Sequence, residues 1–148
     1  MNKKQELENE LKLAMKAGDD VRKRTIRMAL SNIKMQEIEK RAELDDAVVI
    51  SILQKEIKMR NEAIDDAKKM NRTDLISDNQ AEIVVLEGFL PVQLSEAQVR
   101  AMAQEIISEI NATSPTDMGR VMKELLPRLQ GQAPNSLASQ IVKQLLTN

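Results

Sequence analysis

The sequence has 148 residues with nearly balanced charge, 22 basic against 23 acidic side chains, and a net charge of −1. Without cysteine or histidine, the chain cannot form disulfides, a thiolate nucleophile or the commonest metal sites. The charge balance is unlike that of a typical nucleic-acid-binding domain, and a single Phe without Tyr or Trp leaves no platform for base stacking.

The first ninety residues predict long helices, because all four prolines lie after residue 90 and no alternating strand pattern occurs. The first helix should end near Gly18, a residue suited to a helix C-terminus. The first expected helix covers about residues 3–17, and the second is capped by Asp19 or Asp20 and runs to about Arg41. The third begins after Asp45 or Asp46 and ends near Asn71, and a fourth, capped by Thr73 or Ser77, stops before Pro91.

A boundary is expected at Pro91, because proline disfavours helix at the preceding residue, and Ser95 with Gln98 forms a capping box for a new helix. Beyond it, three apolar stripes at helical spacing can be buried against one another. The sequence therefore predicts an all-α fold with two parts: an N-terminal long-helix subdomain over residues 1–90 and a small C-terminal three-helix bundle over residues 91–148.

The stretch TDMGRVMKELLPRLQGQAP, residues 116–134, places glycine and proline within an apolar helical stripe. Gly119 has two interpretations: it allows a neighbouring helix to approach closely, which we favour, or it clears backbone for a phosphate at the helix N-terminus. Pro127 should kink or end the helix, and Gly131 should complete the end. Asn135 or Ser136 is then expected to cap the last helix.

Two groups of cations are candidates for binding a polyanion. Arg120 and Lys123 share a helix face, with Arg128 nearby and Lys143 on the last helix. A second stripe lies opposite the apolar side of the second helix and includes Arg24, Arg27 and Lys34. A solvated surface is the competing interpretation of both groups. Phosphate is the expected ligand, bound without reading sequence.

Catalysis has little support in the sequence. The adjacent pairs Asp19/Asp20, Asp45/Asp46 and Asp65/Asp66 point about 100° apart on a helix and cannot share a proton-transfer site. No phosphate loop, dinucleotide fingerprint, nucleophile elbow or zinc motif is found, so no catalytic residue, cofactor or metal is expected. The N-terminus has no signal-peptide pattern and no apolar run is long enough to span a membrane, which predicts a cytoplasmic protein without membrane contact.

Five segments follow one another along the chain: IRMALSNIK, KEIKMRNEAIDDAKKMNRTDL, EIVVLEGFLPVQLSE, DMGRVMKELLPRLQGQA and IVKQLL. Their order resembles the YqeY-like family, which is similar to the C-terminal tail domain of the B subunit of glutamyl/aspartyl-tRNA amidotransferases. The resemblance covers nearly the whole chain, and its most specific parts are FLPVQLSE and DMGRVMKELLPRLQG. It implies an all-helical fold and a connection to tRNA, since the tail domain contacts the tRNA body away from the catalytic centre.

By this resemblance the chain is expected to be a tRNA-binding accessory module, with an aminoacylation or amidation enzyme as a further partner. The implied tRNA-facing residues are Gly119, Arg120, Lys123, Arg128, Gly131 and Lys143. Family members commonly show a basic residue, alanine, an acid and glycine after the glycine matching Gly131. Here Gln132, Ala133, Pro134 and Asn135 follow, which removes one cation and stiffens the turn.

Two other functions compete with tRNA binding. The first is a helical protein-interaction module without RNA binding, in which Met28 and Met35 beside the basic stripe supply adaptable apolar contacts. The second is an amide-transferring enzyme, a carbon–nitrogen ligase of the amidotransferase type. It requires a glutamine-hydrolysing apparatus for which the sequence shows no residues.

Overall fold

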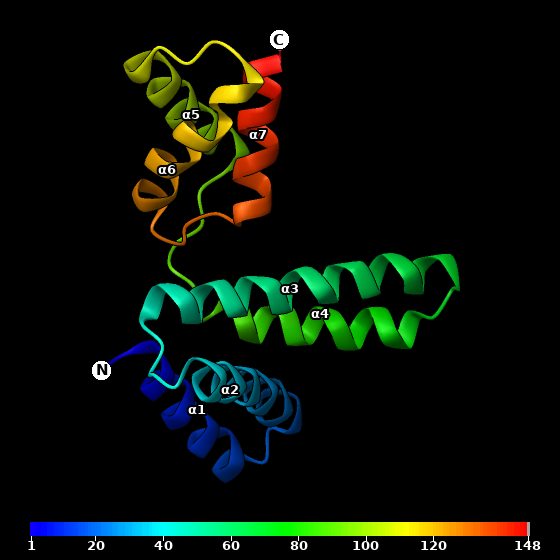
Figure 1. Ribbon diagram of the computed structural model, residues 1–148. Helices are drawn as coiled ribbons and strands as arrows, with labels where there is room; N and C mark the ends of the chain where they lie inside the picture. Colours follow the sequence, from blue (N-terminus) through cyan, green and yellow to red (C-terminus); the bar gives the residue numbers. More distant parts are fainter. Residues whose placement is uncertain (148) are drawn as a thin grey trace. The chain divides into compact units, whose positions relative to one another are not determined.

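The computed structural model describes residues 1–147, and its regular elements are all helical (Figure 1), which confirms the all-α prediction. In chain order they are α1 Lys3–Ala17, α2 Asp20–Lys40, α3 Asp46–Lys69, α4 Thr73–Glu87, α5 Glu96–Ile110, the 3-10 helix η1 Pro115–Asp117, α6 Met118–Leu129 and α7 Asn135–Thr147. Their contacts divide the described chain into two compact units, the first ending at Leu90 and the second beginning at Pro91.

Short polar residues and glycine set most of the helix ends. Asp19 and Asp45 accept bonds from the backbone N–H groups of Arg22 and Val48 at the starts of α2 and α3. Gly18 ends α1 in the left-handed conformation, with φ of 69°. Two expected caps are wrong: the cap position of α4 is Arg72, which makes no side-chain capping bond, and α7 already begins at Asn135.

The first unit consists of the α1–α2 pair packed with the antiparallel hairpin of α3 and α4 (Figure 1). Its apolar core contains side chains from all four helices and that of Phe89, which follows α4. The largest fully buried side chains are Leu7, Ile26, Ile33, Leu53 and Leu86.

A polar network lies within the first unit between α2, α3 and α4. Arg60 Nη1 donates to Glu56 Oε2 at 2.6 Å, and both residues are buried. Asn32 of α2 donates to the other carboxylate oxygen of Glu56, and Arg60 Nε lies 3.9 Å from Glu82 of α4. The pairing of both charges offsets part of the large cost of removing them from water.

In the second unit, helices α5, α6 and α7 each contact the other two. Val99, Ile106, Val121, Leu125 and Ile141 are fully buried among them. The three apolar stripes thus form one core, as helices of a small bundle do.

Candidate nucleic-acid interface

Gly119 lies in the first turn of α6 and is exposed. A methyl group added at its Cα would meet no atom within 4 Å, so no neighbouring helix approaches there. The favoured packing interpretation of this glycine is therefore wrong. No contact with the residues that the structure describes requires glycine at this position.

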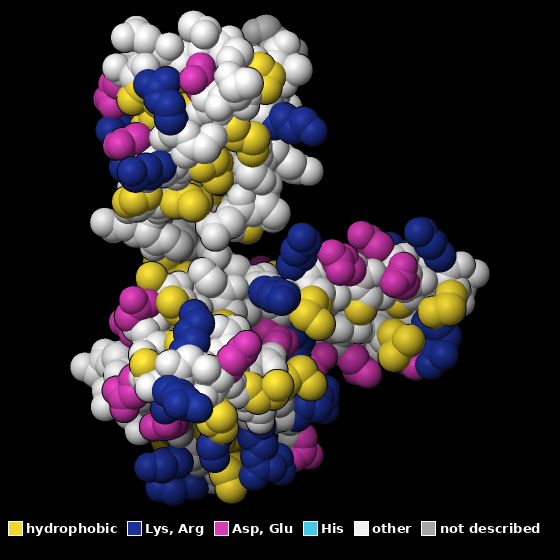
Figure 2. All heavy atoms as spheres, in the orientation of Figure 1, with side chains coloured by type: hydrophobic (Ala, Val, Ile, Leu, Met, Phe, Trp, Pro, Cys, Tyr) yellow, Lys and Arg dark blue, Asp and Glu magenta, His cyan; other side chains and the backbone are white. Residues whose placement is uncertain are grey.

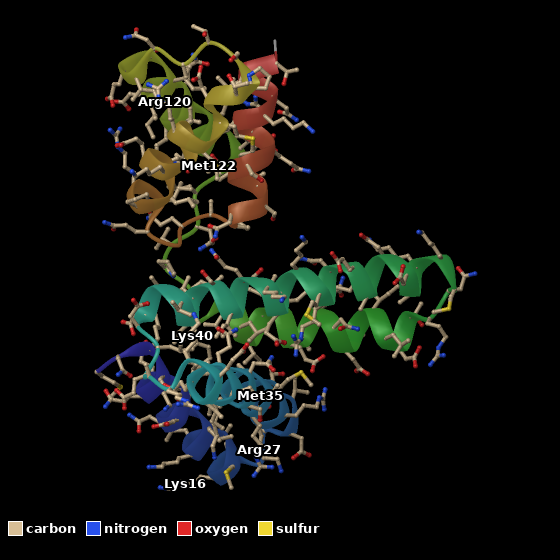
Figure 3. All side chains as sticks on the ribbon, in the orientation of Figure 1. Lys16, Arg27, Met35, Lys40, Arg120 and Met122 are labelled. Atoms are coloured by element: carbon tan, nitrogen blue, oxygen red, sulfur yellow. The ribbon has the colours of Figure 1, made fainter. Side chains whose placement is uncertain are left out.

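Arg120 is held beside the turn that precedes α6 (Figure 3). Its guanidinium donates to Asp117 Oδ1 at 3.1 Å and to the carbonyl of Ile110 at 3.1 Å. Asp117 in turn accepts bonds from the backbone N–H groups of Thr113 and Ser114, at 3.0 and 3.3 Å. Those two N–H groups, followed by Arg120, hold the pKa of Asp117 below its ordinary value. The carboxylate thus holds the turn before α6, and it makes no capping bond to the N–H groups at the start of that helix.

Arg128 is near the C-terminal end of α6, and its guanidinium lies 2.8 Å from Glu109 of α5. The hydrogen bond with Glu109 raises the pKa of Arg128 above its ordinary value. Both side chains are substantially exposed, so solvent screens the pair and a phosphate can compete for the guanidinium.

Lys123 and Lys143 are exposed and form no salt bridge with any described residue. Lys123 is on α6, and Lys143 is on α7. Pro127 does not end α6, which continues to Leu129, so the alternative of termination there is wrong. The proline lacks an N–H, and the carbonyl four residues earlier, at Lys123, therefore receives no bond from it.

Gly131 belongs to the turn that follows α6, with φ of 76°. Its carbonyl accepts a bond from Gln93 Nε2 at 3.0 Å, and the carbonyl of Gln132 accepts one from the N–H of Leu94 at 2.8 Å. The segment FLPVQLSE is therefore bonded to the end of DMGRVMKELLPRLQG. These bonds give Gly131 a role in holding the turn, and its left-handed backbone explains why glycine suits it.

The cations of α2 do not form one free stripe. Arg24 lies 3.4 Å from Glu82 of α4. Arg27 approaches the sulfur of Met15 at 3.9 Å, and it forms no salt bridge with a described residue. Lys34 also forms none, although it lines a shallow depression that contains Glu8, Glu37 and other side chains. Arg27 and Lys34 therefore remain available to an external anion.

Sequence reasoning missed the carboxylates that pair with the candidate arginines. Glu109 and Asp117 were not linked to Arg128 and Arg120, because helix–helix packing and the turn before α6 bring them together. The spacing of three between Asp117 and Arg120 could have indicated the second pair. Exposed Ile38 was also missed, although it continues the spacing of Met28 and Met35 along α2.

Within residues 1–147 the structure forms neither a cluster of metal ligands nor a helix suited to crossing a membrane. No group of three or more acidic side chains is arranged to hold a metal ion. No helix among them combines the length and apolarity that a membrane crossing needs.

Comparison with known proteins gives one family over almost the whole chain: the model for "Yqey-like protein" matches residues 4–146. A Lachancea thermotolerans protein named "Altered inheritance of mitochondria protein 41, mitochondrial" is 36% identical over 74% of this chain, which spans 60% of that protein's length. Proteins of the same name from Kluyveromyces lactis and Saccharomyces cerevisiae YJM789 are 33% and 28% identical over 93% of this chain, and it spans 79% and 80% of their lengths.

The expectation of a cytoplasmic protein is wrong in the light of these relatives, which are named as mitochondrial proteins. That expectation was drawn from the absence of a secretory signal pattern. Such an absence is evidence about secretion only and does not distinguish the cytosol from an organelle.

Proposed function

The chain belongs to the Yqey-like protein family, and on that premise we propose that it is a non-catalytic tRNA-binding accessory module. The observation that carries the proposal is the pair of exposed ammonium groups of Lys123 and Lys143, which have no carboxylate partner among the described residues. Cations of this kind release counterions from a phosphate backbone and bind it without reading its sequence.

The two arginines of α6 would also bind phosphate, each by exchanging its present carboxylate partner for a phosphate group. Arg120 and Arg128 are each paired with a carboxylate at the surface, where such pairs contribute little stability. A backbone phosphate carries the same single negative charge and can accept two bonds from one guanidinium, whereas each arginine makes one bond to its present carboxylate. The lysines would then contact the phosphates first. The arginines would add further contacts after their present ion pairs break.

Each of the two compact units would have its own role. Residues 91–148 would act as a C-terminal three-helix subdomain that carries the phosphate contacts. Residues 1–90 would act as an N-terminal helical subdomain available to an aminoacylation or amidation enzyme. No catalytic residue is assigned, and the mitochondrial names of the relatives make mitochondrial tRNA the first RNA to test.

The test compares tRNA binding by the full chain with that of two variants that lose the same amount of charge. Lys123→Gln/Lys143→Gln should weaken binding at least tenfold at low salt, because both unpaired cations of the second unit are lost. Lys68→Gln/Lys69→Gln, at the exposed end of α3, should bind as the unmodified chain does. Equal losses in both variants would show a non-specific effect of net charge and would reject the proposed surface.

A helical protein-interaction module is the second candidate function. The observation that favours it is the exposure of large apolar side chains along α2, at Met28, Met35 and Ile38. Isolated exposed apolar residues are ordinary, but several on one helix face are typical of an interaction site.

A further inference from the structure

The outer face of α2 carries a seam of three apolar residues and one serine, which we define as Met28, Ser31, Met35 and Ile38. Their spacing of three, four and three residues places all of them within about 80° on the helix. Met28 is 50% exposed, Met35 67% and Ile38 68%. This is the a/d spacing with which one helix packs its side chains between those of another.

The seam is supported from within the first unit. Arg60 Nη2 of α3 lies 3.4 Å from the sulfur of Met28, and Asn32 is bonded to Glu56 of the same helix. These contacts hold α2 against α3, and Met28, Met35 and Ile38 are still at least half exposed. Figure 2 shows hydrophobic side chains among Lys and Arg over this part of the first unit, and Figure 3 labels Met35 and Arg27 on α2.

Unpaired cations border one side of the seam. Arg27 and Lys34 are seven residues apart, about 10 Å along the helix axis, and both occupy the position just before a seam residue. Glu39 lies on the other flank, so the face has opposite charges on its two sides. Residues at these flanking positions select a partner helix by charge.

We propose that this face of α2 binds an acidic amphipathic helix of a partner protein. The partner would lay apolar side chains at heptad spacing on the seam and place Asp or Glu, seven residues apart, beside Arg27 and Lys34. This inference gives the second candidate function a defined ligand, and it does not depend on tRNA binding by the second unit.

RNA fits this face less well than an acidic helix does. Two cations about 10 Å apart offer few phosphate contacts, and covering the seam with a charged backbone would bury methionine and isoleucine against phosphates. The face also has no aromatic side chain on which an exposed base could stack, since the one Phe is buried.

A second copy of this chain fits less well too. Antiparallel pairing of two α2 helices would set Arg27 and Lys34 against the same cations of the other copy. Parallel pairing would match Lys34 with Glu39 but would leave Arg27 opposite Asn32, a neutral side chain. An acidic helix pairs both cations, and the like charge that it meets on this face is Glu39 on the other flank.

The experiment uses the full chain and two synthetic peptides of three heptads each, both with Leu at a and d. One peptide has Glu at e and g, and the other has Lys there. The Glu peptide should bind at least tenfold more tightly than the Lys peptide, and Arg27→Glu/Lys34→Glu should reverse that preference. Met35→Glu should abolish binding, whereas Met70→Glu, a matched change at an exposed methionine beyond α3, should not. Circular dichroism confirms that each variant is folded.

Several results would overturn the proposal. These are binding of neither peptide, equal binding of both, or an unchanged preference in the charge-reversed variant. If Met35→Glu abolished tRNA binding instead, the face would be an RNA surface. A concentration-dependent dimer lost in Met35→Glu would show that a second copy occupies the seam.

Discussion

Glu109 Oε2 lies 2.8 Å from the guanidinium of Arg128, so a carboxylate of α5 already occupies one of the cations proposed to meet RNA. Arg128 must therefore leave this carboxylate before it can bind a phosphate. An arginine that must leave a carboxylate contributes less to phosphate binding than one that is unpaired.

We therefore predict that Glu109→Gln strengthens tRNA binding, by about threefold or more at low salt, since it removes a repulsive charge and releases Arg128. The slope of log affinity against log salt should steepen by about 0.9 for one additional phosphate contact. Glu62→Gln is the matched control, because Glu62 is exposed on α3 and forms no salt bridge with a described residue. Equal gains in both variants would assign the effect to net charge alone.

The buried pair of Glu56 and Arg60 should dominate the stability of the first unit's polar network. Glu56→Ala removes one partner and leaves a buried guanidinium, which should lower the free energy of unfolding by about 3–5 kcal/mol. Urea denaturation measures the change. Glu62→Ala, on the exposed face of the same helix, should change it by less than about 0.5 kcal/mol.

A double variant separates the effect of the buried charges on stability from the effect of side-chain packing. Glu56→Leu/Arg60→Met replaces both groups with apolar ones of similar size, and it should recover most of the stability that Glu56→Ala loses. If the single Glu56→Ala variant is as stable as the unmodified chain, the network has no structural role.

Leu125 is fully buried at the centre of the second unit. Leu125→Ala should cost about 2–5 kcal/mol through lost burial and the cavity left behind. If the two units fold as separate subdomains, amide hydrogen exchange should accelerate in residues 91–147 and stay unchanged in residues 1–90. Uniform acceleration over both units would contradict the proposed subdomain division.

Asp117 should make the stability of the second unit dependent on acid pH. Its folded pKa is lowered from an ordinary value of 3.8, because Thr113 and Ser114 donate to its carboxylate and Arg120 lies beside it. A lowered folded pKa gives stability that is complete above the unfolded value and is lost as pH falls through the folded value. Thermal unfolding between pH 7 and pH 2 should show this loss below about pH 4.

Asp117→Asn should unfold at a lower temperature than the unmodified chain at pH 7 and should show a smaller loss below pH 4. Glu124→Gln, an exposed change on α6 without a salt bridge to any described residue, is the control and should keep the full acid dependence. An unaltered profile in Asp117→Asn would mean that the carboxylate contributes nothing to the turn.

Helix positions could be predicted closely from the sequence because their signals are local. The capping box of Ser95 and Gln98 sits where expected, and Gly18 ends α1. Pro127 was harder to interpret, because a proline in the last turn removes only one bond and the helix can continue past it. Gly119 was misread because composition cannot show whether another helix lies nearby.

Whether each candidate cation has a carboxylate partner depends on the tertiary structure. Arg24 meets Glu82 from a helix more than fifty residues later, and Arg128 meets Glu109 across the α5–α6 contact. Helical periodicity places a side chain on a face, but it does not say which helix lies opposite. Lys123 and Lys143 could be named from the sequence, whereas their lack of a partner among the described residues could not.

The most direct test of tRNA binding by this protein is the affinity of the full, unmodified chain for tRNA measured over a range of salt concentrations. Two unpaired lysines and two releasable arginines predict measurable binding at low salt and a log–log slope between about −2 and −4. Absence of binding at low salt, or binding that does not change with salt, would contradict the account.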